Sequence, residues 1–227
     1  MNASIAENLA HVHAQIDAAC QAEGRAPGSV RLLAVSKTWG PEAVRAAHAA
    51  GQTAFGENYI QEAVDKIVAL EDLPLEWHCI GPIQSNKTRL VAEHFDWVHS
   101  VDRLKIAQRL SEQRPNHLPP LQVCIQVNVD GGETKSGVSP QALPALALAV
   151  AALPRLQLRG LMTIPEPAET DTQMRAVHAQ SHALFESLRQ QGLPLDTLSM
   201  GMSADLSAAI AEGSTVVRVG TAIFGRR

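Results

Sequence analysis

The chain has 227 residues, a formal net charge of −4 and 45% hydrophobic residues. This length predicts one large α/β domain or two small ones, with enough core to fold without a disulfide or a metal. A mildly acidic chain with 4% aromatic residues has no basic track for a nucleic acid and little surface for base stacking. Its three cysteines form no CxxC pair, and no apolar run is long enough to cross a bilayer, so we expect a cytoplasmic protein.

Helical and strand-like segments alternate along the chain. A capping box at Ser4 and Glu7 predicts a helix that runs to about Ala22 and stops at Gly24. Several later segments are continuous apolar runs, which are typical of parallel strands buried on both faces. The predicted strands are Arg31–Val35, Thr53–Gly56, Glu76–Ile80, Trp97–Val101, Gln122–Val129, Gln157–Met162, Thr197–Met200 and Val216–Val219. Helical patterns fill the gaps, and a last one is predicted to begin near Ser203.

This alternation predicts either a (β/α)8 barrel or a doubly wound sheet, and eight β units in about 190 residues favour a compact barrel. We therefore expect residues 1–227 to form a single (β/α)8 barrel domain. The residues after Val219 are too few for an eighth outer helix. The N-terminal helix, with Ile5, Leu9, Val12 and Ile16 at helical spacing, is expected to cover the gap between the last and first strands.

The active face of such a barrel lies at the carboxyl ends of its strands. Lys37 follows the first apolar strand directly. If apolar atoms bury its ammonium, its pKa falls, and a neutral lysine can attack a carbonyl group and form a Schiff base. The alternative is a lysine that extends out of the barrel mouth into water.

Small and polar residues follow the last two strands. The segment SMGMS at 199–203 leads into a predicted helix, and Gly220 and Thr221 follow the eighth strand. Loops at this position in barrels often bind phosphate through backbone N–H groups. Both loops could equally be ordinary turns between strand and helix.

Arg218 lies in the last apolar strand, two residues before Gly220, so both face the same side of the strand. A buried arginine needs an acceptor, either a protein carboxylate or a ligand atom. A carbonyl-reactive lysine, a phosphate site and an arginine at one mouth together suggest pyridoxal 5′-phosphate. Lys37 would take the aldehyde, the last two loops the phosphate, and Arg218 the pyridine nitrogen.

A resemblance to a known family supports this interpretation. The segments AVSKT, FGENYIQE, WHCIGPIQSNK, HSVDR, ETKSGV, RGLMTIP, LSMGMSADLSAAI and RVGTAIFGRR, in this order from about Leu33 to Arg227, closely resemble the YggS/PROSC family of pyridoxal phosphate homeostasis proteins. The resemblance implies a barrel like the N-terminal domain of bacterial alanine racemases. It also implies a role as an intracellular carrier or buffer of the cofactor.

The resemblance assigns the cofactor-binding residues by motif. Lys37 would hold pyridoxal 5′-phosphate as a Schiff base, and Arg218 would meet its ring nitrogen. The phosphate would bind to Ser203, Gly220 and Thr221. Asn58 of the GENY motif would line the site, although Glu57 and Asn58 could instead cap the following helix. No residue is assigned a catalytic role.

Three functions remain open at this stage. The first is a cofactor carrier without turnover, which would supply enzymes that depend on pyridoxal phosphate. The second is a weak amino-acid racemase, for which His78, His99 or Lys135 would have to supply a second proton donor. The third is a class I aldolase-like barrel in which Lys37 attacks a substrate and no cofactor is present. Because racemases dimerise partly through a domain that this chain lacks, we expect a monomer.

Two further features have simpler interpretations. Lys135, in a glycine-bearing loop after the fifth strand, could accept the aldehyde from Lys37, or it could be an exposed loop lysine. His178 and His182 have the spacing of a helical metal pair, but the segment HAQSH lacks the acidic residue of HExxH. We therefore expect a solvated helix face and no metal site there.

Overall fold

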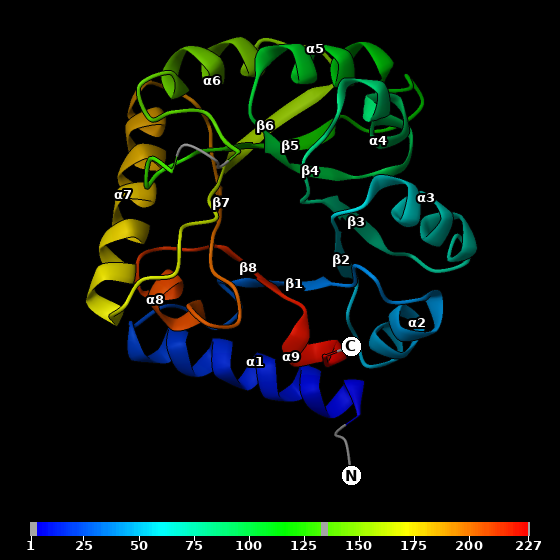
Figure 1. The fold of residues 1–227 in the computed structure, drawn as a ribbon, viewed down its shortest axis with the longest axis vertical. Coiled ribbons are helices and arrows are strands. Elements are labelled where there is room, and N and C mark those ends of the chain that lie inside the picture. The colour runs from blue at the N-terminus through cyan, green and yellow to red at the C-terminus, as the bar shows by residue number, and fades with distance from the viewer. Residues whose placement is uncertain (1–3, 133–135, 227) are drawn as a thin grey trace.

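The computed structural model describes residues 4–132 and 136–226. Within these ranges eight parallel strands pair in chain order, and β8 pairs with β1 to close a barrel (Figure 1). The strands are β1 (Arg31–Val35), β2 (Ala54–Glu57), β3 (Glu76–Cys79), β4 (Trp97–Val101), β5 (Leu121–Gln126), β6 (Leu156–Met162), β7 (Thr197–Ser199) and β8 (Val216–Val219). The predicted (β/α)8 class is confirmed.

The helices between the strands form an outer layer around the barrel (Figure 1). They are α2 (Pro41–Ala49), α3 (Ile60–Ala69), the 3-10 turn η1 (Ser85–Lys87) with α4 (Thr88–His94), α5 (Leu104–Gln113), α6 (Leu143–Ala151), α7 (Asp171–Gln190) and α8 (Leu206–Ala211). Pro41 is the first residue of α2, where its missing N–H costs nothing, and a capping box at Thr170 begins α7. None of the described helices is long and apolar enough to span a membrane.

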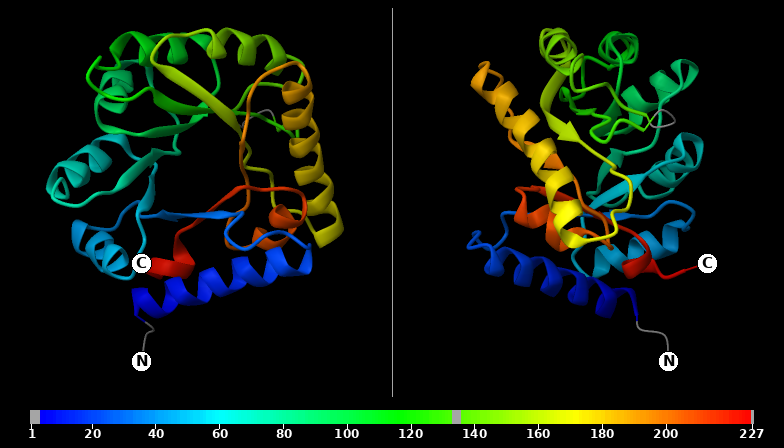
Figure 2. Two further views of the ribbon diagram at one scale, coloured as in Figure 1. Left: turned by 180° about the vertical axis from the view of Figure 1, so that it is seen from behind. Right: turned by 60° about the vertical axis from the view of Figure 1, so that its left-hand side comes forward.

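The N-terminal helix α1 (Ile5–Ala22) begins at the predicted capping box of Ser4 and Glu7. It packs against α8, α2 and the single-turn helix α9 (Thr221–Phe224) that follows β8. The side-chain amide of Asn8 donates to the carbonyl of Ile223 at 2.8 Å, which ties the two ends of the chain together. Figure 2 shows α1 beneath β8 and β1 from both directions. Its predicted role as the cover over this gap is therefore confirmed.

Several predicted strand ends differ from the observed ones by one residue, and two predicted boundaries differ by three. The strand expected to reach Val129 ends at Gln126, because Val127 forms an isolated bridge with Val138. The helix expected near Ser203 begins at Leu206. There, the carboxylate of Asp205 accepts the N–H of Met202 at 2.7 Å and holds residues 202–205 in a turn.

Strand residues alternate between two cores. In β1, Leu32 and Ala34 belong to the large core shared with the helices, whereas Leu33 and Val35 belong to a separate buried cluster. Alternation in a closed barrel assigns this second set to the interior. A further cluster of Trp97, Cys124 and Met162 is also separate from the helix-facing core. The same alternation points Arg218 into the barrel, because Val217 and Val219 belong to the helix-facing core.

Candidate functional site

A cavity of about 720 Å³ opens at the carboxyl ends of β1, β2, β7 and β8. A smaller cavity of about 480 Å³ lies among residues at the amino-terminal strand ends, including Arg31 and Glu76. The larger cavity is lined by Val35, Lys37, Thr38, Trp39, Asn58, Ile80, Ile164, Met202, Ser203, Ala204, Arg218, Gly220, Thr221, Gly225 and Arg226. The fold thus brings all six predicted cofactor-binding residues to one cavity.

Lys37 stands in the turn that joins β1 to α2, at the cavity edge. The preceding strand is buried to Ser36, but Lys37 itself is exposed. Of the two alternatives that the sequence left open, the lysine that extends toward water is the one observed. The strand end does place the amine beside the cavity, within a turn whose next residue, Thr38, has a φ of 66°. Backbone in this region is rarely adopted by residues other than glycine, so other contacts must hold the turn.

Ser203, Gly220 and Thr221 lie where the β7–α8 and β8–α9 loops meet the cavity. A Cβ atom added at Gly220 would lie 3.0 Å from the carbonyl oxygen of Val35, so a side chain there would crowd the first strand. Gly220 is also the residue before α9, whose first N–H groups have no acceptor within the helix. These loops therefore offer hydroxyl and N–H donors to an anion in the cavity.

Asn58 directly follows β2 and lines the cavity from the other side. The helix α3 that follows has Tyr59 as its N-cap residue and no side-chain cap bond, so the alternative capping role is not observed. Within the described residues, Asn58 Oδ1 is buried and has no hydrogen-bond partner. A buried polar atom without a partner costs free energy unless a ligand or water satisfies it. Asn58 is thus a candidate ligand contact.

Arg218 is 4% exposed and lines the cavity. Its Nη1 donates to Ser199 Oγ at 2.7 Å, and its Nη2 donates to the carbonyl of Thr163 at 2.9 Å. Burial lowers the pKa of Arg218 to about 10, and the charge of Asp205 opposes this shift. The guanidinium therefore remains protonated at neutral pH. Its observed partners are neutral oxygens rather than the carboxylate that sequence reasoning considered.

A line of buried hydrogen bonds continues from Arg218 through the barrel. Ser199 Oγ lies 2.8 Å from His99 Nδ1, His99 Nε2 lies 2.8 Å from His78 Nδ1, and His78 Nε2 lies 2.6 Å from Glu76 Oε1. Burial lowers the pKa of both histidines, for His99 to well below its ordinary value. The rings are therefore neutral. The two candidate proton donors are thus part of the barrel interior and are absent from the described lining of the cavity.

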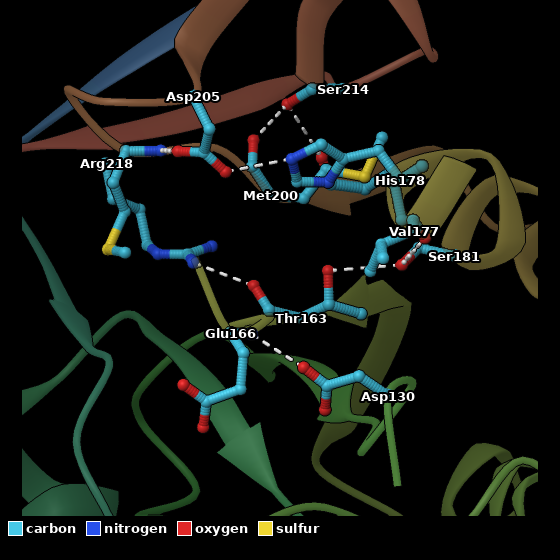
Figure 3. A network of polar contacts seen from close by, with 12 residues as sticks. Asp130, Thr163, Glu166, Val177, His178, Ser181, Met200, Asp205, Ser214 and Arg218 are labelled. Atoms are coloured by element: carbon cyan, nitrogen blue, oxygen red, sulfur yellow. Dashed lines mark hydrogen bonds and ion pairs between the residues drawn. The ribbon is translucent and has the colours of Figure 1, made fainter. Parts of the chain in front are cut away.

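The loop that carries Ser203 is held by a hydrogen bond between Asp205 and the buried His178 (Figure 3). Asp205 Oδ2 lies 2.9 Å from His178 Nε2, and Asp205 Oδ1 accepts the N–H of Met202. Although burial acts against ionisation, the hydrogen bonds from His178 and Met202 leave the pKa of Asp205 lowered. His178 is 0% exposed, so the prediction of a solvated helix face is wrong at this residue. Its partner Asp205 is 27 residues away in the chain, so the spacing of His178 and His182 could not indicate this contact.

The predictions for Lys135 and for a metal site concern other parts of the chain. Lys135 lies outside the described residues, so its proposed part in cofactor transfer stays a prediction. Among residues 4–132 and 136–226 no group of three or more histidine, cysteine, aspartate or glutamate residues could hold a metal ion. Thr163 directly follows the predicted strand Gln157–Met162, and Ser199 lies within the predicted strand Thr197–Met200, but the sequence did not connect either of them to Arg218.

Comparison with known proteins places this site in a class. Residues 8–227 match the model of the family described as "Alanine racemase, N-terminal domain". An alanine racemase from Corynebacterium glutamicum shares the fold, with a TM-score of 0.70 and 21% identity over 98% of this chain and 60% of that one. The class is thus a barrel of the alanine racemase N-terminal type.

Relatives of similar length narrow the class. A pyridoxal phosphate homeostasis protein of Pseudomonas aeruginosa is 65% identical over 99% of this chain and 96% of its own length. The protein of that name from Escherichia coli is 55% identical over 98% of this chain and 97% of its own length. The structure of PipY from Synechococcus elongatus with PLP bound has a TM-score of 0.87 and 42% identity, covering 98% of this chain and 100% of that one. The chain belongs to the YggS/PROSC family of pyridoxal phosphate homeostasis proteins.

Proposed function

We propose that this protein binds pyridoxal 5′-phosphate through a Schiff base on Lys37 and acts in cofactor homeostasis as a carrier or buffer without catalytic turnover. One observation carries the proposal: the amine of Lys37, near the N-terminus, lines the same cavity as a buried arginine and two donor-bearing loops near the C-terminus. Cofactor sites have volumes of about 300–1,000 Å³, and this cavity lies in that range. PLP homeostasis relatives and PLP-bound PipY support the choice of ligand.

Each residue of the site has a distinct role in this proposal. Schiff-base formation joins Lys37 Nζ to the aldehyde carbon and releases the carbonyl oxygen as water, so no oxidant or reductant is needed. Ser203, Gly220 and Thr221 bind the phosphate with hydroxyl and N–H donors. Asn58 supplies the polar atom that has no partner within the described protein.

Arg218 explains why turnover is not expected. Bound pyridoxal phosphate supplies an electron sink for carbanion chemistry, and that sink is strongest when its ring nitrogen is protonated. Arg218 keeps its own proton at neutral pH, and its contacts with Ser199 and Thr163 hold the guanidinium in place. A cation that does not release its proton favours an unprotonated ring nitrogen. Arg218 therefore weakens the electron sink.

Racemisation also requires an acid or base on each face of the substrate, and the described residues offer little for the second face. His78 and His99 are buried in the barrel and hydrogen-bonded to each other. Tyr59, the single tyrosine in the chain, is 55% exposed and absent from the described cavity lining. We propose that the protein works as a monomer in the cytoplasm and passes its cofactor to enzymes that require it.

The test is a visible spectrum of the purified protein with added pyridoxal 5′-phosphate, before and after borohydride, followed by peptide mapping. We expect an absorption band of a Schiff base and a reduced pyridoxyl group on Lys37. Lys37→Ala should abolish the band, whereas the matched variant Lys105→Ala, at an exposed lysine of α5, should keep it. A reduced pyridoxyl group on another residue of the wild-type protein would overturn the assignment.

Further measurements separate the other functions. Turnover of any member of a panel of L- and D-amino acids by the loaded protein would favour the weak racemase. A failure to bind pyridoxal phosphate, together with borohydride trapping of a carbonyl substrate on Lys37, would favour the aldolase-like barrel. Sedimentation of the loaded and unloaded protein tests the expected monomer.

A further inference from the structure

A buried cluster of charged side chains lies under the turn that carries Lys37. It consists of Glu57 at the end of β2 and of Glu62 and Lys66 from α3. The side chains of Lys66 and Glu57 are 3% and 0% exposed. Lysine and glutamate are rarely buried so fully unless they are paired, so this cluster needs an explanation.

Lys66 is the centre of the cluster. Its Nζ lies 2.6 Å from Glu57 Oε1 and 3.2 Å from Glu62 Oε1, and it donates to the carbonyl of Ser36 at 2.9 Å. The ammonium thus joins α3 and β2 to the backbone of the residue immediately before Lys37.

The two carboxylates complete the contact on both sides of Lys37. Glu57 Oε1 accepts the hydroxyl of Ser36 at 2.6 Å. Glu62 Oε1 accepts the N–H of Thr38 at 2.7 Å, in the residue whose φ is 66°. The residues before and after Lys37 are therefore both fastened to the β2–α3 unit. That unit also carries Asn58, which lines the same cavity.

The cluster is better explained by geometry than by stability. Burying two opposite charges costs several kcal/mol of desolvation, which their attraction offsets only in part, and apolar replacements of similar volume are often as stable. Burial raises the pKa of the Glu57 carboxyl, and Lys66 and Ser36 oppose the shift. Among the described atoms Glu57 Oε2 has no partner, which adds to the cost. A cluster chosen for stability alone would not need contacts with both neighbours of one lysine.

We infer that Glu57, Glu62 and Lys66 are positioning residues that hold the Lys37 turn in the conformation required for Schiff-base formation. This inference rests on the proposed function. The three side chains are absent from the cavity lining, so they act through their contacts with Ser36 and Thr38. Since Lys37 is exposed and its side chain is long, a fixed backbone limits where its amine can reach. Loosening the turn should slow the covalent step and leave the phosphate and ring contacts intact.

The experiment compares covalent and non-covalent binding. The main variant is Glu57→Gln with Lys66→Met, which removes both buried charges at similar volume. Rapid mixing with pyridoxal 5′-phosphate gives the rate of Schiff-base formation. Equilibrium binding of pyridoxine 5′-phosphate, which has an alcohol in place of the aldehyde, reports the non-covalent contacts. We expect the rate to fall by about 10- to 100-fold, the cost of misplacing a reacting group by about 1 Å, and the analogue to bind as it does to the wild type.

A stability control and a conservative variant make the result specific. Leu188→Ala creates a cavity in α7, away from the turn, and should cost about 2–5 kcal/mol of folding stability without changing the rate. Lys66→Arg retains the charge and the donors and should recover part of the rate. If the double variant does not fold, the rate of Schiff-base formation in Glu62→Ala tests the inference instead. Glu62 is only half-buried, and its loss removes the acceptor of the Thr38 N–H. A wild-type rate in the folded double variant, or in Glu62→Ala when it decides, overturns the inference.

Failure of the proposed function has a different result. If the wild-type protein forms no reducible bond to Lys37, the function itself fails. If Lys37 is labelled equally fast in the wild type and the variants, the function stands and only the positioning role fails. Equal slowing in Leu188→Ala would reduce the cluster to a general stabilising role and would also overturn the inference.

Discussion

Arg218 Nη1 donates to Ser199 Oγ across 2.7 Å inside the barrel, and this contact begins a line of hydrogen bonds that ends at Glu76. The direction of these bonds is set at the Glu76 end, because a carboxylate can only accept, so neutral His78 donates to it from Nε2 and accepts at Nδ1 from His99 Nε2. Neutral His99 then accepts at Nδ1 from the Ser199 hydroxyl, which also accepts from Arg218. One arrangement of neutral tautomers therefore satisfies the whole line.

Ser199→Ala should break this line at its centre. The substitution leaves the Nη1 of Arg218 without its acceptor and His99 Nδ1 without its donor, both in the buried interior. We expect the free energy of unfolding in urea to fall by about 1–3 kcal/mol, the cost of an unsatisfied buried polar group. The matched variant Ser187→Ala, at an exposed serine of α7, should leave it unchanged. Equal stability of the two variants would contradict the assignment.

Asp205→Asn should alter the dependence of stability on pH. Because the folded-state pKa of Asp205 is lowered, its ionised form stabilises the fold above the unfolded pKa of about 3.9, and this contribution is lost as pH falls through the folded pKa. The variant should be less stable than the wild type at pH 7, and the difference should shrink below about pH 4. Urea midpoints measured from pH 7 to pH 3 check this. A difference that stays constant to the lowest pH would contradict it, and Asp65→Asn, at an exposed aspartate, serves as the control.

Gly81→Ala should disturb the cavity wall at Asn58. A Cβ atom at position 81 would lie 2.3 Å from the carbonyl oxygen of Asn58 and 2.8 Å from its Cα, so the backbone of Asn58 would have to move. We expect affinity for pyridoxal 5′-phosphate to fall by about tenfold, measured by titration of the absorption band. Gly28→Ala is the control: its Cβ meets open space, but its φ of 75° makes the substitution costly in stability alone. Loss of affinity in the control but not at position 81 would refute this.

The three cysteines should be unreactive in the folded protein. Cys20, Cys79 and Cys124 are all buried, and burial raises the pKa of Cys79 and of Cys124 to about 12. Since the thiolate is the reactive form, a disulfide reagent that reports released thiolate should give no rapid signal at pH 8. The same reagent in denaturant should titrate all three thiols. Rapid labelling of any thiol in the native protein would be inconsistent with the observed burial.

Local patterns were sufficient for the elements and for most of the cavity. Strands β1, β4 and β8 have the predicted ends, because their apolar runs stop at a polar residue or a glycine. The predicted capping box at Ser4 is formed, because it depends on residues three apart. Barrel topology then brings strand ends to one face, so Lys37 and Arg218 could be assigned to a shared mouth. The exposure of Lys37 could not be predicted, since it depends on how far the strand end projects.

The burial of Lys66 had only a weak signal in the sequence. Ala63, Lys66, Ile67 and Leu70 recur at helical spacing, so a lysine on the buried face of α3 was visible in the sequence. The pattern did not show which carboxylate would meet it. Glu57 lies nine residues before it, in the preceding strand, and the two touch only because α3 folds back onto β2.

The sequence by itself determined the alternation of strands and helices, the helix caps and the set of residues that we propose to bind a carbonyl and a phosphate. Each of these depends on neighbours a few positions apart. Only the tertiary structure decided that Ser199 meets Arg218 and His99, and that Glu57 and Lys66 hold the turn of Lys37. Those partners come from different strands, and closure of the barrel brings them within hydrogen-bond distance in a buried site where each donor must find an acceptor.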